Sequence, residues 1–292
     1  MSNQLPIVLA HGIARFDVLL EILKTKLKLP DTELSERFHY FKGIKPHLEA
    51  QGFTVFHPNQ DFAGGVELRS QQLKARVDEA LATTGADQVR IIAHSMGGLD
   101  ARHMIVDLGM ADKVAQLTTI GTPHQGTPLA DHMLSQQAGV LLVDVLQRVI
   151  NVDGFADLTM RSCEEFNRRA EDQEAKNTVS YQAYGSFESG HLVFAPLIAS
   201  WRFITDHAGK NDGLVPFTSQ QWQKELISSD GLRKTVVQKE YPLPADHLNQ
   251  VGWWDPQEAL NPLVGFASAF KQAANYEDQI KAVYLEIAKS FS

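Results

Sequence analysis

The 292-residue sequence has one cysteine, Cys163, and it contains no fixed-period repeat and no low-complexity tract. A lone cysteine excludes an intrachain disulfide, so packing must hold the fold together, and we interpret Cys163 as a bystander. The longest apolar stretch, 138–150, is short and interrupted by polar residues, which excludes an integral membrane segment. Residues 1–10 contain no lysine or arginine, so no cleavable signal peptide is expected. We therefore expect a cytoplasmic protein, one secreted without a cleavable signal peptide, or a sequence given in mature form.

Basic residues are also fewer than acidic ones. The sequence has 27 Lys and Arg and 35 Asp and Glu, so the formal net charge is 27 − 35 = −8. Nucleic-acid binding needs clustered cations that release counterions from phosphates, so nucleic acid is not an expected partner. A hydrophobic content of 43% with 21% charged residues excludes the disordered class. A chain of this length can bury most of its apolar surface in one core. We predict a single domain over residues 1–292, and the oligomeric state stays open.

Short apolar runs alternate with helical patterns along the first 120 residues. This alternation predicts an α/β fold, with a mostly parallel sheet and helices on both of its faces. The expected strands cover 5–10, 53–56, 89–93, 114–120, 178–184 and 235–239. The expected helices cover 44–51, 66–81, 98–107, 129–150, 163–170, 257–274 and 277–289.

Two segments interrupt the alternation and are predicted to be insertions. Between about 125 and 170 two helical stretches follow each other without a strand, which makes this segment a candidate lid. Its apolar face comprises Leu134, Val140, Leu141, Val145, Leu146 and Val149. An amphipathic helix at the ligand edge of a sheet can cover a pocket or lie on lipid, but the same pattern fits a plain core helix. The smaller insertion, about 18–39, is either a second flap or a solvated helix.

The run Ile91–Gly98 (IIAHSMGG) takes an apolar strand into a helix through a small-x-Ser-x-Gly turn. Such a turn is a nucleophile elbow, in which the serine is held at a strained backbone position with its hydroxyl above the sheet. Gly97 provides the small residue after Ser95, and Ala93 replaces the first glycine with a residue that still fits. The free N–H groups of the following helix favour negative charge beside the serine. We therefore predict that Ser95 is a nucleophile rather than a simple helix cap.

A serine hydroxyl needs a histidine to take its proton and an acid to orient that histidine. After a nucleophile elbow the acid and then the histidine follow along the chain. His247 comes directly after the strand expected at 235–239, where a loop reaches the carboxyl edge of the sheet. The rival histidines are His191 and His207. His247 is therefore the predicted base.

Asp212 is the predicted acid because it lies in the tight turn Asn-Asp-Gly at 211–213, which an apolar segment follows. Its rivals are Asp206 and Asp246, and a side chain adjacent to His247 in sequence points away from the imidazole. For the oxyanion of the tetrahedral intermediate, two N–H donors are required. One is predicted to be the amide of Met96, directly after the nucleophile. The other is predicted to be the amide of Ile13, in the loop after the first strand, whereas His11 is interpreted as structural.

These residues together resemble the bacterial triacylglycerol lipases of the α/β-hydrolase superfamily. The resemblance covers 5–17, 40–61, the elbow AHSMGGLDAR at 93–102, TIGTPHQGTPLAD at 119–131, NDGLVP at 211–216 and DHL at 246–248. It implies the α/β-hydrolase fold, ester hydrolysis through an acyl-enzyme, a triad of Ser95, Asp212 and His247, and a helical lid. Many of these lipases hold a structural calcium through two aspartates, one of them shortly after the histidine. Asn249 stands at that place and is a poorer ligand than a carboxylate, so neither a metal nor another cofactor is predicted.

We predict a serine carboxylester hydrolase, a lipase or an esterase, whose partner is a small apolar ester in solution or at a lipid–water interface. The same triad also serves thioesterases, acyltransferases and polyester depolymerases, because pocket and lid decide the substrate. A non-catalytic scaffold that binds an apolar ligand is the alternative from another class. Acyl chain length, head group and calcium dependence are not specified by these residues.

Overall fold

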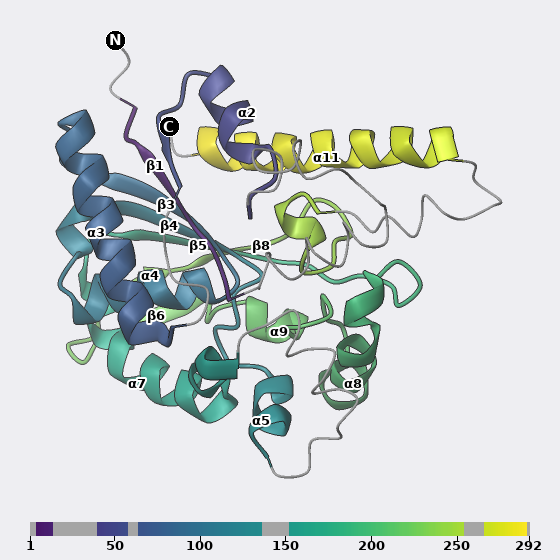
Figure 1. Ribbon diagram of the computed structural model, residues 1–292. Helices are drawn as coiled ribbons and strands as arrows, with labels where there is room; N and C mark the ends of the chain where they lie inside the picture. Colours follow the sequence, from purple (N-terminus) through teal and green to yellow (C-terminus); the bar gives the residue numbers. More distant parts are fainter. Residues whose placement is uncertain (1–3, 14–39, 58–63, 136–151, 254–265, 291–292) are drawn as a thin grey trace.

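One parallel sheet organises the computed structural model, which describes residues 4–13, 40–57, 64–135, 152–253 and 266–290 (Figure 1). In these residues six parallel strands are paired in the order β2-β1-β3-β4-β5-β8, beside a separate antiparallel hairpin. The sheet strands are β1 (Ile7–Ala10), β2 (Val55–Phe56), β3 (Val89–His94), β4 (Val114–Ile120), β5 (Ser180–Gly185) and β8 (Val237–Glu240). The hairpin consists of β6 (Glu225–Ile227) and β7 (Arg233–Thr235).

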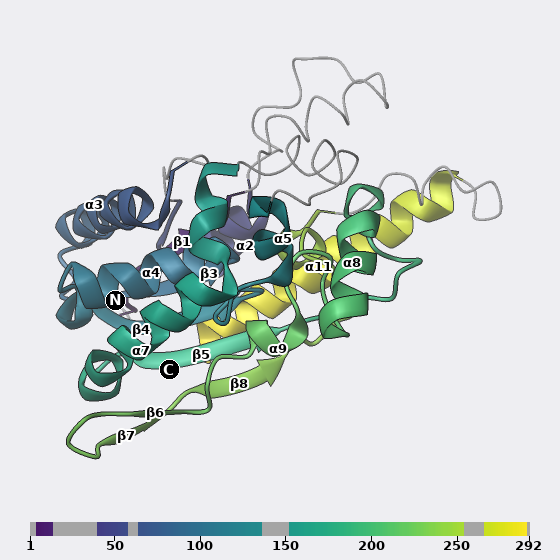
Figure 2. The same ribbon diagram turned by 90° about the horizontal axis from the view of Figure 1, so that it is seen from below.

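Helices cover both faces of this sheet, as Figures 1 and 2 show from two directions. The α-helices are α2 (Ile44–Ala50), α3 (Val66–Thr84), α4 (Met96–Asp107), α5 (Pro128–Leu134), α7 (Met160–Lys176), α8 (Ile198–Ala208), α9 (Phe217–Gln220) and α11 (Phe266–Lys289). The 3-10 turns are η2 (Ala111–Lys113), η3 (Val152–Leu158), η4 (Ala195–Leu197) and η5 (Asn249–Val251). The α/β fold with helices on both faces is therefore confirmed.

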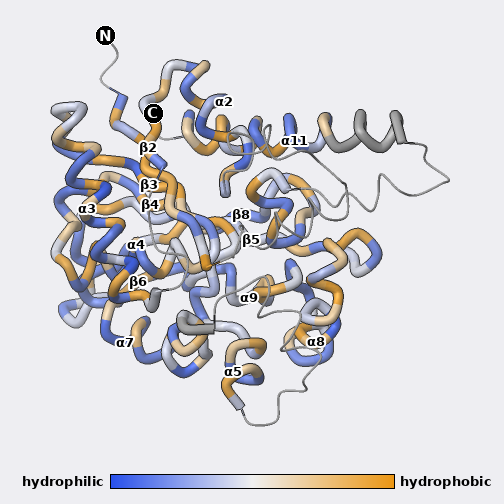
Figure 3. Tube along the Cα trace, viewed as in Figure 1, coloured by the Kyte–Doolittle hydropathy of each residue, from blue (hydrophilic) through white to orange (hydrophobic). Residues whose placement is uncertain are grey.

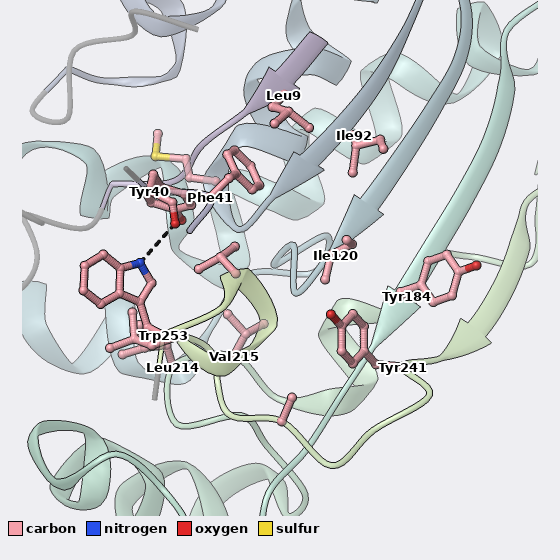
Figure 4. Close-up of a cluster of buried hydrophobic side chains, with 14 of the residues drawn as sticks. Leu9, Tyr40, Phe41, Ile92, Ile120, Tyr184, Leu214, Val215, Tyr241 and Trp253 are labelled. Carbon is pink, nitrogen blue, oxygen red and sulfur yellow. Dashed lines mark hydrogen bonds between the residues drawn. The ribbon is translucent and has the colours of Figure 1, made fainter. Parts of the chain in front are cut away.

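The strand sequences explain the two layers, because successive side chains of a strand point to opposite faces. Ile7 and Leu9 of β1 pack in the core under α2 and α11, whereas Val8 and Ala10 pack in the core under α3, α4 and α7. Both faces of the central strands are buried, and β1 (IVLA) is therefore apolar throughout. The strands β3 and β4 are mostly buried but also contain polar residues such as Thr118 and Thr119, and part of this sheet is orange in Figure 3. Tyr184 of β5 lies in the first of these cores, shown in Figure 4.

Most predicted elements occur with boundaries within about three residues, but four predictions are corrected. The helix expected at 129–150 is not continuous, because α5 ends at Leu134 and Ser135 has an extended backbone. The two closing helices are a single helix, α11, within the described residues, because no glycine or proline interrupts 266–289. The helix expected at 163–170 extends over Met160–Lys176, after the side chain of Thr159 caps it by accepting a hydrogen bond from the amide of Ser162. The strand expected at 235–239 begins at Val237, because Arg233–Thr235 instead pairs with β6 in a hairpin that the sequence did not reveal.

The predicted lid segment, 125–170, divides into parts with different surroundings. Helix α7 is a core helix, because Phe166 and Ala170 pack in the same core as α3 and α4. Helix α5 and the η3 turn instead lie at the carboxyl edge of the sheet. Residues 136–151, with most of the predicted apolar face, lie outside the described residues, as do residues 18–39 of the smaller predicted insertion.

A buried ion pair joins α7 to α4. The guanidinium of Arg102 donates to both carboxylate oxygens of Glu174 at 2.8 and 2.9 Å, and both side chains are buried. The guanidinium also lies over the Trp222 ring, 4.0 Å from its centroid. Because desolvated charges are stable only when paired, this contact fixes α4, the helix that begins next to Ser95.

We predict that Arg102→Met lowers the free energy of unfolding by about 3–5 kcal/mol, because it leaves the Glu174 carboxylate buried without its partner. The matched control is Arg161→Met, which removes the exposed Arg161–Glu165 pair on α7. This control should unfold within error of the parent, since solvent screens exposed pairs. Chemical denaturation of the three proteins tests the prediction, and equal stability of both variants would contradict it.

Candidate active site

Ser95 occupies a strained turn between β3 and α4. Its φ of 57° and ψ of −136° make it the non-glycine residue with positive φ among the described residues. Such backbone strain costs of order 1–3 kcal/mol and persists only where neighbouring contacts enforce it. Here the Ser95 amide donates to the carbonyl of Ile120 at 2.9 Å, and the hydroxyl of Thr122 donates to the Ser95 carbonyl at 2.8 Å. The predicted elbow geometry is therefore present.

Two glycines allow the chain to pass this close to itself. A Cβ at Gly97 would lie 2.5 Å from the carbonyl oxygen of Ala10, and a Cβ at Gly12 would lie 2.6 Å from the Cβ of Ser95. Real Cβ atoms do not approach other atoms so closely. The loop after β1 is consequently held directly against the start of α4. Many nucleophile elbows have glycine at the position of Ala93. The alanine is accommodated here and is fully buried.

His247 and Asp212 form the pair that the sequence predicted. The imidazole Nδ1 lies 2.7 Å from Oδ2 of Asp212, and the His247 amide donates to the Asp212 carbonyl at 2.8 Å. Oδ1 of the same carboxylate accepts the amides of Leu214 and Val215 at 3.0 and 2.8 Å. With Nδ1 donating to the carboxylate, Nε2 of the neutral ring is an acceptor. Ser95 and His247 line one pocket, and the Ser95 hydroxyl has no hydrogen-bond partner among the described residues.

The rival acids and bases lie elsewhere. Asp206 and His207 are exposed on α8, and His191 is exposed in the preceding loop. Asp246 is fully buried, but its carboxylate accepts the amides of Phe194, Leu248 and Asn249 rather than a proton from the imidazole. Burial raises the pKa of Asp246 to about 7. Its contacts shape the loop that carries His247.

The predicted oxyanion donors, Ile13 and Met96, belong to the two segments that approach each other at the elbow. A Cβ at Gly154 would lie 3.3 Å from side-chain atoms of both residues, so these side chains lie near one another. The loop carrying Ile13 is anchored from behind, since the guanidinium of the fully buried Arg69 donates to the carbonyl of His11 and to the Asp100 carboxylate. Sequence reasoning missed this anchor, because an arginine in an amphipathic helix is ordinary.

The pocket at this edge is mainly apolar. Ser95 and His247 line it together with residues of the β1 loop, α5, η3 and the Asp212 turn. The residues that line it are Ile13, Tyr40, Ser95, Pro123, Thr127, Leu129, Phe155, Leu158, Leu214, Val215 and His247. Figure 4 shows Leu214 and Val215 in the same region as Tyr40, whose carbonyl accepts the Trp253 indole N–H at 3.1 Å. Such a lining suits an apolar ligand.

A series of buried side-chain hydrogen bonds behind the pocket was not predicted. Oδ2 of Asp212 also accepts the side-chain amide of Gln250 at 2.9 Å. The other end of that amide, Oε1, lies 2.9 Å from Nε2 of His94, and Nδ1 of His94 lies 2.6 Å from the Tyr40 hydroxyl. Burial, with a contribution from His247, holds the pKa of His94 well below its usual range. The place of His94 in the elbow motif was a sequence signal that could have identified this residue. Nothing in the sequence pairs His94 with Gln250.

Asn249, which stands where the resembled lipases have a calcium-binding aspartate, is engaged within the protein. Both ends of the Asn249 side-chain amide are occupied, because its oxygen accepts the amide of Asp246 at 3.2 Å and its nitrogen donates to the Trp253 carbonyl at 2.7 Å. Among the described residues no three His, Cys, Asp or Glu side chains cluster as metal ligands would. Cys163 is buried, and burial raises the pKa of its thiol to about 12, so the thiol stays protonated.

The chain is similar in sequence to proteins named as triacylglycerol lipases. The family described as "PGAP1-like alpha/beta domain" matches residues 72–154. A triacylglycerol lipase of Saccharomyces cerevisiae is 28% identical, over 85% of this chain and 80% of its own length. A triacylglycerol lipase of Pseudomonas fragi is 30% identical over 75% of this chain, and one of Vibrio cholerae is 36% identical over 44%. The chain spans 58% and 36% of these two bacterial proteins, respectively.

Solved structures share the fold. The mature lipase BlEst2 of Bacillus licheniformis superposes with a TM-score of 0.62 at 17% identity, covering 85% of this chain and 86% of its own. A metagenomic carboxyl esterase, MGS0156, gives a TM-score of 0.59 at 16% identity, covering 98% and 76%. The chain has the α/β-hydrolase fold, and its sequence similarity to triacylglycerol lipases supports a carboxylic ester hydrolase. Among the described residues no helix is long and apolar enough to cross a membrane.

Proposed function

We propose that this α/β-hydrolase, which resembles triacylglycerol lipases along most of its length, hydrolyses apolar carboxylic esters through an acyl-enzyme on Ser95. One observation carries the proposal. His247, which is joined to the buried Asp212 at 2.7 Å, lines the same apolar pocket as a serine that is held at positive φ. A strained serine beside an acid-oriented imidazole is the arrangement that nucleophilic acyl transfer requires.

In the first half-reaction the Ser95 oxygen attacks the ester carbonyl while its proton passes to Nε2 of His247. Asp212 holds the resulting imidazolium by accepting its Nδ1–H. The amides of Ile13 and Met96 donate to the oxyanion, and each such donor contributes roughly 10²–10³ in rate. The intermediate collapses when the ester C–O bond breaks and the departing alcohol takes the proton from His247. The acyl group remains on Ser95.

In the second half-reaction water attacks the acyl carbon and gives a proton to His247. Collapse of this second intermediate breaks the bond to Ser95, and the serine oxygen recovers that proton. The products are one carboxylic acid and one alcohol, so hydrolysis consumes one water. Acyl transfer to another alcohol would use the same steps with that alcohol in place of water.

The pocket favours an apolar acyl chain. Seven of the residues that line the pocket have aliphatic or aromatic side chains, namely Ile13, Leu129, Phe155, Leu158, Leu214, Val215 and Tyr40. Burial of an acyl chain gains about 0.8 kcal/mol per methylene. Helix α5 and the η3 turn supply part of this wall, so the portion of the predicted lid segment that flanks the pocket contributes to substrate binding. An ester presented at a lipid–water interface fits the same opening.

Ser95→Ala should lower kcat/KM for ester hydrolysis by about 10⁴ or more, because the nucleophile is lost while the fold is kept. Ser70→Ala is the matched control, since Ser70 is equally a buried serine whose hydroxyl donates only to the Val66 carbonyl one turn away. That control should retain full activity. Initial rates and thermal melting of both variants make the test. If the Ser95 variant kept more than about one per cent of parental kcat/KM, the proposed nucleophile would be wrong.

Rates on p-nitrophenyl esters from acetate to palmitate should increase with acyl length beyond acetate, because longer chains bury more apolar surface in the pocket. A maximum at acetate would contradict the apolar acyl pocket.

A chelator should leave these rates unchanged, since Asn249 is engaged within the protein. A loss of activity with chelator that added calcium restores would contradict the prediction that no metal is needed. With an added alcohol, hydrolysis should still exceed transfer of the acyl group to that alcohol.

A further inference from the structure

We propose that Gln250 and His94 are positioning residues that hold the Asp212 carboxylate in line with His247. This inference rests on the proposed function, because it assigns a role toward the same acid and base. Neither side chain lines the pocket, so neither is placed to touch the substrate. Both are buried behind it, in a chain of hydrogen bonds that runs from Tyr40 through His94 and Gln250 to Asp212.

The carboxylate of Asp212 needs more than one anchor to stay oriented. Its Oδ1 is held by the two backbone amides of the turn, whereas Oδ2 is shared between His247 Nδ1 at 2.7 Å and Gln250 Nε2 at 2.9 Å. Two side chains therefore donate to Oδ2, the imidazole of His247 and the amide of Gln250. As a neutral amide it donates without a positive charge, so it does not compete with the imidazolium for the carboxylate.

The orientation of the Gln250 amide is determined by its neighbours. Its nitrogen lies 2.6 Å from the hydroxyl of Ser186, which itself donates to the Ala245 carbonyl at 2.7 Å and so can only accept from Gln250. Both amide protons are thus used, one on Ser186 and one on Asp212. The amide oxygen consequently faces His94, which must donate from Nε2. A flipped amide would aim its oxygen at the Asp212 carboxylate.

His94 can donate from Nε2 because it is neutral and has a defined tautomer. Tyr40 donates its hydroxyl proton to Nδ1 of His94 at 2.6 Å, which leaves the ring proton on Nε2. Burial lowers the pKa of His94, and the ring of His247 lies 4.6 Å away between centroids. A second positive charge beside the imidazolium is therefore disfavoured. The directions of the hydrogen bonds from Tyr40 to His94, from His94 to Gln250 and from Gln250 to Asp212 are therefore consistent with one another.

The backbone around Gln250 preserves this arrangement. The hydroxyls of Tyr241 and Tyr284 donate to the Gln250 carbonyl at 3.3 and 3.1 Å, the second from the C-terminal helix α11. At Gly121, where φ is +60°, a Cβ would lie 2.1 Å from Gln250 Oε1. The end of β4 thus leaves room for the amide, and α11 holds its main chain. Such a supporting shell keeps catalytic groups within the small tolerance that chemistry requires.

Gln250→Met tests the role, because methionine has similar length but cannot donate. We expect kcat to fall by about 10- to 100-fold with KM within about twofold, since the missing donor affects the reacting groups rather than substrate binding. The matched control is Gln182→Met, at a buried glutamine of β5 whose amide nitrogen has no partner among the described residues. This control should keep the parental kcat. Titration of active sites with a fluorophosphonate corrects each rate for misfolded protein.

His94→Phe, alone and combined with Gln250→Met, tests whether the two residues act as one chain. If His94 acts through Gln250, kcat of the double variant should lie within about twofold of that of Gln250→Met. Gln250→Glu adds a negative charge beside Asp212, so the acidic limb of its kcat/KM profile should move to higher pH. A merely structural role would change the melting temperature without moving this limb.

A kcat for Gln250→Met within twofold of the parent, after active-site titration, would overturn the positioning role of Gln250. Multiplicative losses in the double variant would overturn the role assigned to His94. An acidic limb that does not move in Gln250→Glu would also count against the inference. Each of these results is distinct from failure of the proposed function, which is signalled by full activity in Ser95→Ala.

Discussion

The close approach of two backbones, where the loop after β1 meets the start of α4, is the constraint on which the rest of the site depends. Gly97 and Gly12 make it possible, since a Cβ at either would lie 2.5 or 2.6 Å from its neighbour. The same approach holds Ser95 at positive φ and brings Ile13 beside Met96. The proposed nucleophile and the proposed oxyanion donors therefore depend on one packing contact. A larger residue at either glycine would move both at once.

Buried polar contacts keep that contact rigid. Helix α4 carries two buried ion pairs, in which Asp100 binds Arg69 of α3 and Arg102 binds Glu174 of α7. Arg69 also reaches the carbonyl of His11 and thereby ties α3 to the loop after β1. Because a buried charge is costly without its partner, each pair penalises movement of α4 relative to its neighbours. These buried ion pairs therefore resist the backbone movement that would relieve the strain at Ser95.

On the other side of the pocket, hydrogen bonds hold the Asp212 carboxylate in place. They come from the backbone amides of Leu214 and Val215 and the side-chain amide of Gln250, which are neutral donors, and from the imidazole of His247. Neutral donors stabilise the carboxylate without cancelling its charge, which stays available to the imidazolium. The site therefore combines ion pairs that fix the helices with neutral donors that orient the acid.

Local signals made much of this predictable. Apolar runs placed the strands, and the small residues around Ser95 placed the elbow, because steric limits act within a few residues. Asp212 and His247 were found from chain order and turn chemistry. Contacts between distant segments were not found, as 156 residues separate His94 from Gln250 and 72 separate Arg102 from Glu174. The continuity of α11 was also missed, since two helices were predicted on either side of 275–276 although no glycine or proline lies there.

We propose that Ser95, oriented by Asp212 and His247 and facing the amides of Ile13 and Met96, is the reacting group. This role can be tested by a crystal structure of the protein after reaction with a long-chain fluorophosphonate, with peptide mass mapping of the adduct. We expect phosphorus on the Ser95 oxygen, with one phosphoryl oxygen about 2.7–3.1 Å from both amide nitrogens and the alkyl chain between α5 and η3. Modification of a different residue, or a phosphoryl oxygen turned away from both amides, would contradict it.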